Sequence, residues 1–475
     1  MSELAQTSLR HEESSSIYLP KSFQEEGILH LLENPNGGLF FTPGLGKTAI
    51  TLQAFVILQK EKAVRNALVV APIRVAQNVW PAEVEKWVNF RHLSYVVLHG
   101  PKKNQLVNED VDLYFCNPEG LAWLATTDLF KRVDMLIVDE SQKFRNSQTQ
   151  RFRTIRKAIP KFKRRAILTG TPTPNGLMQL WSQMFILDGG NRLGKTLSEF
   201  RRRYFRPLHR PGFTEWELLD GAAEQISVAV SDVIMHKDVR VLAEMPDLVN
   251  NTIRVTPGEI ALGQYAELKK RFVIELENSE VSAFSSGALA NKLKQMSSGT
   301  VYGDEGEHVA VFDAKYLALR DLIEDEGGRP VIVFYQYNHE LARLKEEVAD
   351  APHIGGGMTR KKIAEVLRAW DNNEMPVLYA HPQAAGLGLN MQGSECTSVV
   401  WFSIPWDLEF YTQGIARIWR QGQKASKIVV HHLVAEQTMD EQVLQALMMK
   451  ENVQEYLMKS LTGKQATSGR AALEQ

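Results

Sequence analysis

The sequence has few cysteines and no long apolar run. Among its 475 residues are two cysteines, Cys116 and Cys396, which are too few for a disulfide framework, a four-thiolate zinc site or an iron–sulfur cluster. No apolar stretch approaches the length of a membrane span, and the opening MSELAQTSLRHEESSS has neither the basic nor the apolar region of a secretory signal. We therefore expect a cytoplasmic protein that does not bind membranes.

The chain also lacks an excess of charge of either sign. It carries 55 Lys and Arg against 56 Asp and Glu, for a formal net charge of -1, so a polyanionic partner would have to bind a local patch. A hydrophobic fraction of 44% and a charged fraction of 23% are typical of globular proteins. At about 150 residues per domain, the length predicts two or three domains.

Short apolar runs alternate with helix-length segments in two series. The first series runs from 67–72 to 166–171 and the second from 330–336 to 428–434, a pattern typical of βα units and parallel sheets. Residues 258–296 read as helices, and we place the boundary near Pro246 or Pro257. The expected divisions are a disordered segment (1–16), a first lobe (17–245) with a small helical insertion at about 185–235, a second lobe (246–460) and a flexible tail (461–475).

Two segments resemble a phosphate-binding loop. The strict pattern G-x4-G-K-[ST] occurs at 189–196 (GGNRLGKT), but the preceding LMQLWSQMFIL has helical spacing. A phosphate loop instead joins a strand to a helix N-terminus, so we interpret this match as an ordinary loop. FTPGLGKT at 41–48 departs from the pattern at Phe41, yet it follows the apolar GGLFF and precedes the helical AITLQAFVILQK. We predict that the nucleotide-binding residues are Gly44, Leu45, Gly46, Lys47 and Thr48.

An apolar strand, MLIVDE, ends in Asp139 and Glu140. A carboxylate at this position can hold Mg2+, and its neighbour can orient or deprotonate an attacking water. Lys47 can reach the β- and γ-phosphates of a nucleotide, while the Thr48 hydroxyl and Asp139 are the expected metal ligands. Together, the loop and the carboxylate pair predict ATP hydrolysis with Mg2+.

Two further motifs follow in order, TGTPTPN at 169–175 and QGIARIWRQGQ at 413–423. With them the sequence resembles the superfamily-two helicase-type ATPases, and it is most similar to the Swi/Snf-type DNA translocases over roughly residues 18 to 450. The resemblance implies an α/β fold of two tandem RecA-like (P-loop) parallel-sheet lobes with the ATP site in the cleft between them. In the fourth position of the Asp-Glu box, Gln142 replaces the usual histidine, and HPQAAG at 381–386 replaces a Ser/Thr-rich segment. In these positions the sequence looks most like the short bacteriophage and bacterial members of the family. That resemblance implies that the protein is located in the cytoplasm of a bacterium or of an infected host cell.

The resemblance also implies roles for individual residues. Gln24, within YLPKSFQEEGI, would read the adenine edge. Arg417 and Arg420, three residues apart on an expected helix, would act as arginine fingers on the γ-phosphate, with Gln413 one turn earlier. The other implied positions are Gly388 at the nucleotide, Gln142, Thr169, Gly170 and Thr171 in coupling, and Pro72, Gln336 and Gln383 toward DNA.

Basic residues are concentrated directly after the Asp-Glu box. The segment 143–165 contains ten Lys and Arg and no Asp or Glu, so it can bind phosphates without reading base sequence. Its candidate contacts are Arg145, Arg151 and Arg153. A second cluster, FRRRYFRPLHR at 200–210, has six basic residues counting His209, and we predict that it guides the duplex.

The expected function is ATP-driven movement of a monomer along double-stranded DNA without sequence specificity. Two alternatives stay open. A strand-separating DNA or RNA helicase would differ in whether duplex or single strands stimulate its ATPase. A scaffold with a vestigial ATP site would be indifferent to loss of Lys47, and the retained Asp139, Glu140 and both arginines argue against it.

Overall fold

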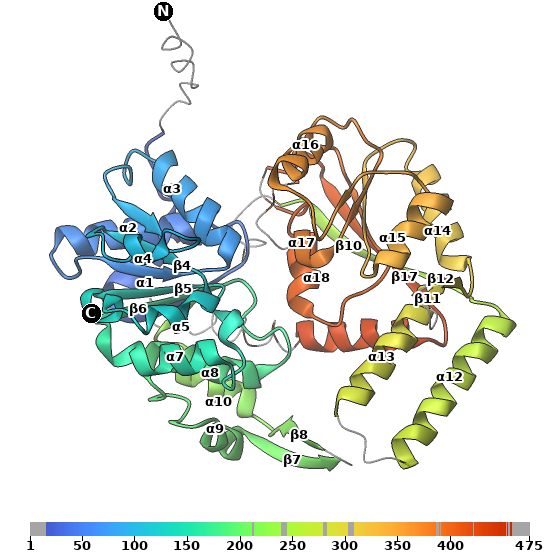
Figure 1. Ribbon diagram of the computed structural model, residues 1–475, viewed down its shortest axis with the longest axis horizontal. Coiled ribbons are helices and arrows are strands. Elements are labelled where there is room, and N and C mark those ends of the chain that lie inside the picture. Colours follow the sequence, from blue (N-terminus) through green and yellow to red (C-terminus); the bar gives the residue numbers. More distant parts are fainter. Residues whose placement is uncertain are drawn as a thin grey trace, which may run out of the picture.

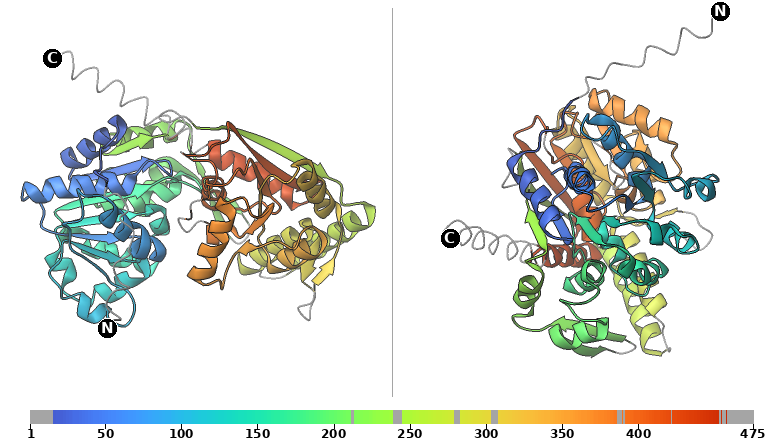
Figure 2. Two further views of the ribbon diagram at one scale, coloured as in Figure 1. Left: turned by 90° about the horizontal axis from the view of Figure 1, so that it is seen from above. Right: turned by 90° about the vertical axis from the view of Figure 1, so that its left-hand side faces the viewer.

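The computed structural model describes residues 16–210, 213–238, 245–278, 283–302, 308–385, 389, 391–420, 422–452, 454 and 457. They form two lobes side by side, the first blue to green and the second yellow to red in Figure 1, and Figure 2 shows the same division from two other sides. Each lobe is built on a parallel sheet with helices, which confirms the expected α/β class and the two RecA-like lobes. The predicted terminal segments lie outside the described residues except for Ser16.

The first lobe has a seven-stranded sheet in the order β3-β4-β2-β5-β6-β1-β9. Its central strands are apolar throughout because helices cover both faces: in β2, Leu68 and Val70 join one core cluster while Ala67 and Val69 join the other. The strands are β1 (Asn36–Phe41), β2 (Ala67–Val70), β3 (Tyr95–Val97), β4 (Leu113–Cys116), β5 (Met135–Asp139), β6 (Arg164–Thr169) and β9 (Ile234–Lys237). The helices are α1 (Ser22–Glu33), α2 (Lys47–Lys60), α3 (Trp80–Lys86), α4 (Lys103–Leu106), α5 (Leu121–Leu124), α6 (Leu129–Arg132), α7 (Gln150–Ala158) and α8 (Leu180–Asp188).

The expected helical insertion also contains a hairpin. Helices α9 (Leu197–Tyr204) and α10 (Ala222–Val230) flank the antiparallel strands β7 (Phe205–Arg210) and β8 (Phe213–Leu218), which lie at the bottom of Figure 1. Within β8, Trp216 and Leu218 are half-buried while Glu217 is exposed. This alternation is the period-two signal of a strand.

The second lobe has a six-stranded sheet in the order β10-β17-β16-β13-β15-β14. The strands are β10 (Asp247–Val255), β13 (Val331–Phe334), β14 (His353–Ile354), β15 (Val377–Ala380), β16 (Ser398–Trp401) and β17 (Lys427–Ala435). The helices α12 (Glu259–Asn278) and α13 (Ala283–Ser297) occupy the segment predicted to be helical, and the short pair β11 (Thr300–Tyr302) and β12 (His308–Ala310) follows them. Further helices of this lobe are α14 (Ala314–Asp325), α15 (Asn338–Glu347), α16 (Arg360–Asp371), α17 (Pro382–Ala385) and α18 (Leu408–Ile415).

The chain returns to the first lobe after the second sheet is complete. Residues 439–452 are helical and follow β17, and Val443 and Leu447 pack in the core of the second lobe. Leu457, however, is fully buried in a core cluster of the first lobe. Residue 457 falls within the predicted second lobe (246–460). Because Leu457 is buried in the first lobe after β17 of the second, the chain crosses between the lobes twice.

Candidate nucleotide site between the lobes

The phosphate loop lies where the sheet order brings three functional segments together. Strands β5, β6 and β1 are neighbours, so the segments that follow their carboxyl ends meet at one edge of the sheet. Gly44 and Gly46 have φ angles of 90° and 76°, which glycine adopts without strain. A Cβ on Gly44 would meet nothing within 4 Å. The space beside Gly44, ahead of the N-terminus of α2, is therefore open, whereas a Cβ on Gly46 would lie 2.6 Å from Gln24 Nε2.

Two side chains support this loop from within the first lobe. Gln24 Nε2 donates to the Leu45 carbonyl at 3.2 Å, and its Oε1 accepts from the Lys21 backbone N–H at 2.9 Å. The Lys47 amine donates to the Phe41 carbonyl at 2.7 Å, and burial lowers the pKa of this amine against the opposing pull of the nearby carboxylates. Gln24 thus contacts the phosphate loop, and its role in reading the adenine stays a prediction.

Asp139 and Glu140 follow β5 directly. Asp139 is buried and accepts from the Trp80 indole N–H at 3.0 Å and from the Glu140 backbone N–H at 2.9 Å. Burial and then the neighbouring Glu140 carboxylate raise the pKa of Asp139 to about 6. Glu140 has a φ of 51°, a left-handed conformation that costs a non-glycine residue energy and is concentrated at functional sites.

Trp80 is fully buried. Its bond to Asp139 is an additional role that the sequence did not reveal. A π-helical turn at Val75–Val79 precedes α3, and Pro81 follows Trp80. Because proline has no N–H and its ring crowds the preceding turn, a widened turn accommodates it.

Three of the residues predicted to act in coupling, Gln142, Thr169 and Thr171, are joined by hydrogen bonds. Gln142 Nε2 donates to Glu140 Oε2 at 2.6 Å, and Gln142 Oε1 accepts from the Thr169 hydroxyl at 2.7 Å. The Thr171 N–H donates to the Thr169 hydroxyl at 3.1 Å. A Cβ on Gly170 would lie 2.9 Å from Pro43 Cδ, so this turn packs directly on the phosphate loop. Gln142 thus makes the polar contacts that its place in the box requires.

Arg417 and Arg420 come from the second lobe, but the helix expected to carry them ends earlier. Helix α18 stops at Ile415, and the chain continues in turns where the Arg417 N–H bonds the Gly414 carbonyl at 3.2 Å. Burial and the neighbouring Arg420 lower the pKa of Arg417 to about 10, while Glu140 of the first lobe raises it. The Arg417 guanidinium therefore lies within electrostatic reach of the Asp-Glu box.

Of the other residues predicted in the second lobe, Gln336 and Gln413 make hydrogen bonds within that lobe. Gln413 is buried on α18 and donates to Glu409 Oε1 at 3.4 Å. Gly388 lies outside the described residues. Gln336 accepts from the Lys294 amine at 2.9 Å, and Gln383 is exposed on α17.

The basic segment after the box separates into two parts. Arg145 donates to Asp407 Oδ2 and to Glu409 Oε2, each at 2.9 Å, so its guanidinium is occupied within the protein. We therefore do not retain Arg145 as a nucleic-acid contact. Of the other first-lobe candidates, Arg151 pairs with Glu119 at 3.1 Å and Pro72 is half-buried where β2 ends.

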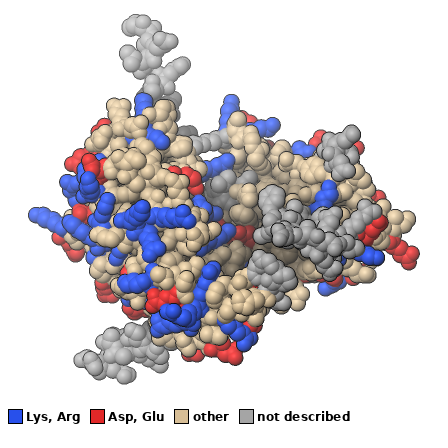
Figure 3. Space-filling model, turned by 60° about the horizontal axis from the view of Figure 1, so that its bottom comes forward, with Lys and Arg blue, Asp and Glu red and all other residues tan. Residues whose placement is uncertain are grey.

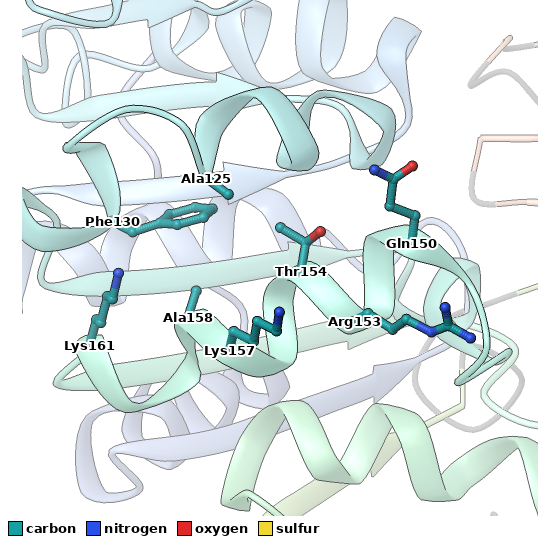
Figure 4. Close-up of a pocket in the computed structure, with 8 residues that line it drawn as sticks. All are labelled: Ala125, Phe130, Gln150, Arg153, Thr154, Lys157, Ala158 and Lys161. Carbon is teal, nitrogen blue, oxygen red and sulfur yellow. The ribbon is translucent and has the colours of Figure 1, made fainter.

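Farther along, a stripe of cations lines a pocket. Arg153, Lys157 and Lys161 are exposed at spacings of four residues along α7 and the turn after it. They line a pocket of about 440 Å3 together with Phe130 and Thr154, and Figure 4 shows the cations around it. In Figure 3, Lys and Arg gather over the first lobe.

The strict pattern at 189–196 is a loop, as interpreted from the sequence. It follows helix α8 rather than a strand. The backbone N–H groups of Gly190, Asn191 and Arg192 all donate to the Asp188 carboxylate, at 2.8 to 3.1 Å. An internal carboxylate thus takes the donors that a phosphate would need.

Among the described residues, no group of three or more His, Cys, Asp or Glu side chains is arranged to hold a metal ion. Within the same residues, no helix is long and apolar enough to cross a membrane. A Mg2+ site of one carboxylate, one hydroxyl and substrate phosphates needs no such group. Of the two predicted ligands, Asp139 is buried at the end of β5 and Thr48 lies in the first turn of α2, which fits a site of this kind.

Comparison with known proteins agrees with this arrangement. The SNF2-related domain matches residues 23–298, and the helicase conserved C-terminal domain matches residues 314–422. Putative protein p41 of Acyrthosiphon pisum secondary endosymbiont phage 1 is 32% identical over 466 residues, 94% of this chain and 99% of that protein. An uncharacterized ATP-dependent helicase of Mycoplasma pneumoniae is 26% identical over 94% of this chain, which spans only 42% of that protein.

A solved structure, the SWI2/SNF2 ATPase core of Sulfolobus solfataricus in complex with dsDNA, has a TM-score of 0.44 and 22% identity, covering 94% of this chain and 95% of that one. Two RecA-like lobes with a phosphate loop and an Asp-Glu box define a helicase-type ATPase. More specifically, the chain belongs to the SNF2-related family, and so to the Swi/Snf-type ATPases.

Proposed function

We propose that the protein hydrolyses ATP with Mg2+ to move as a monomer along double-stranded DNA without sequence specificity. The observation that carries the proposal is the meeting of both lobes at one site. Gln142 of the first lobe bonds both to Glu140 of the same lobe and to Glu409 of the second lobe. A site completed by two lobes makes hydrolysis depend on their closure.

In this proposal each element has a defined task. The phosphates lie on the loop at the start of α2 with the Lys47 amine, and Gln24 reads the adenine. Thr48 and Asp139 would hold Mg2+, which would supply positive charge to the site. Burial and the neighbouring Glu140 raise the pKa of Asp139. A bound cation would favour the ionised carboxylate and so lower this pKa. Glu140 orients the attacking water, and Arg417 and Arg420 stabilise the charge that develops on the γ-phosphate.

The proposal for DNA rests on the charge distribution. The stripe of Arg153, Lys157 and Lys161 has no carboxylate among its pocket-lining residues, and exposed cations of this kind bind phosphates without reading sequence. In the second lobe, Gln336 and the exposed Gln383 are the proposed contacts with the DNA backbone. If each lobe binds the DNA backbone, closing and reopening of the lobes would move the DNA contacts of one lobe relative to those of the other.

The first test is the steady-state ATPase activity of the wild type and of Glu140→Gln, each without nucleic acid and with duplex DNA, single-stranded DNA or RNA. Glu324→Gln, an exposed position on α14, is the matched control. The proposal expects stimulation by duplex DNA that Glu140→Gln abolishes and Glu324→Gln retains. Displacement of a triplex-forming strand would then test movement.

Other outcomes favour the alternatives. Stimulation by single strands or RNA only, together with unwinding of a forked duplex, would identify a strand-separating helicase. A scaffold would be identified by absence of ATPase activity under every condition, together with nucleic-acid or partner binding that is intact in Lys47→Ala.

A further inference from the structure

Glu409 of the second lobe is a buried carboxylate surrounded by donors from the first lobe. Its side chain is 1% exposed. It accepts from Gln142 Nε2 at 3.3 Å, from the Lys143 amine at 2.7 Å and from Arg145 at 2.9 Å. A buried carboxylate needs such partners, and these three come from the few residues that directly follow the Asp-Glu box.

The Gln142 amide is held at three points. Its nitrogen donates both to Glu140 and to Glu409, and its oxygen accepts from Thr169. A side-chain amide has two N–H donors, so both are used when the lobes are in contact. If the second lobe moves away, one N–H loses its acceptor and the amide is no longer held in this orientation.

The same contact also orients the segment that leads to the arginines. Arg145 bridges Glu409 and Asp407, and Asp407 caps α18 by accepting from the Glu409 N–H at 2.9 Å. Helix α18 ends two residues before Arg417. One small group of first-lobe residues therefore fixes the amide beside Glu140 and the start of the helix that precedes Arg417.

We propose that Glu409 is a positioning residue that couples lobe closure to the orientation of Glu140 through Gln142. The inference rests on the proposed ATPase function and extends it by naming the residue that transmits closure. When the lobes meet, Glu409 holds one N–H of the Gln142 amide and thereby directs the other toward Glu140. When they part, Glu140 loses a fixed donor and hydrolysis slows although ATP still binds.

The test compares Glu409→Gln with the wild type at saturating duplex DNA. The substitution preserves volume but replaces an acceptor oxygen with a donor amide. The weakened charged hydrogen bonds should lower kcat by about 10-fold to 100-fold, with little change in the KM for ATP because no nucleotide-binding group changes. Glu441→Gln, whose carboxylate pairs with Arg254 within the second lobe, is the matched control and should keep the wild-type kcat.

A double-mutant cycle tests the route through Gln142. Gln142→Ala should lower kcat, and the double variant with Glu409→Gln should be no worse than the more damaged single variant, because both remove the same relay. Multiplied effects in the double variant, or wild-type kcat in Glu409→Gln, would overturn the proposal. A lower melting temperature with unchanged kcat would also overturn it.

Small-angle X-ray scattering of the nucleotide-free proteins distinguishes a failure of this inference from a failure of the proposed ATPase function. Glu409→Gln should show a larger radius of gyration than the wild type and Glu441→Gln, because the contact between the lobes is weakened. Equal radii would contradict the inference whatever the ATPase shows. A wild type without ATPase would refute the proposed function and the claim for Glu140, while an expanded Glu409→Gln would still support the lobe contact.

Discussion

The Tyr411 hydroxyl lies 2.9 Å from Nε2 of His432 inside the second lobe, and the two rings are stacked. Burial lowers the pKa of His432 to about 4. The imidazole is therefore neutral in the folded protein near pH 7, whereas the unfolded chain binds a proton below about pH 6.5. Protonation of the unfolded state draws the equilibrium toward unfolding as the pH falls.

We predict that His432 makes the second lobe less stable as the pH falls from about 6.5 to about 4, by about 2–3 kcal/mol in total. His432→Gln should lower stability at neutral pH but lose much of this pH dependence. Thermal melts at about pH 7 and pH 5 measure the difference. His92→Gln, an exposed position in the first lobe, should keep the wild-type dependence, and the same dependence in His432→Gln would contradict the assignment.

Arg417 should contribute more to turnover than to ATP binding. Arginine fingers contribute about 10³-fold or more to kcat, so Arg417→Ala should lower kcat by about that factor with a smaller change in KM. Arg417→Lys should restore little, because an amine lacks the planar fork. Arg329→Ala, an exposed ion-paired arginine of the same lobe, provides the comparison. A kcat close to wild type in Arg417→Ala would remove this residue from the site.

The stripe of Arg153, Lys157 and Lys161 should govern salt-sensitive DNA binding. The double reversal Lys157→Glu and Lys161→Glu should weaken duplex binding equally for unrelated sequences. It should also reduce the slope of log affinity against log salt by nearly one for each DNA phosphate that the protein no longer neutralises. Titrations at several salt concentrations measure both effects. Reversal of the exposed pair Lys269 and Lys270 on α12 changes net charge equally, and an identical weakening there would show that only total charge matters.

Removing one partner of a buried ion pair in the second lobe should destabilise the lobe more than removing both partners. The Lys315 amine lies 2.8 Å from Asp440 Oδ2, and both side chains are nearly inaccessible. Lys315→Met leaves a buried carboxylate without its partner and should destabilise the lobe by about 3–5 kcal/mol. Adding Asp440→Leu should recover much of the stability, and urea unfolding of the three proteins checks the order.

The sequence predicted the sheet cores and the phosphate loop because their signals are local. Strand β5 is apolar throughout and ends at Asp139, and glycines precede Lys47 where the backbone needs them. Strand β10 was not predicted because its centre is polar, as suits an exposed edge that pairs only with β17. The helix expected through Arg420 ends at Ile415, and the residues that follow form turns.

The contacts between the lobes could not be read from the sequence. Gln142 and Glu409 are 267 residues apart, and neither belongs to a pattern that predicts its partner. Arg145 illustrates the same difficulty, because a basic run indicates a surface charge and gives no sign of carboxylates supplied by another lobe. Trp80 similarly carries only the signal of a buried aromatic residue, although its indole N–H binds Asp139.

The burial of Leu457 in the first lobe has a mechanical consequence. The chain leaves that lobe after β9 and re-enters it at Leu457, so the second lobe is tethered at two places. A lobe that is connected at two places can rotate about the line through both connections more easily than it can separate from the other lobe. If the lobes open and reclose as proposed, we expect this double connection to guide Glu409 back to Gln142, Lys143 and Arg145.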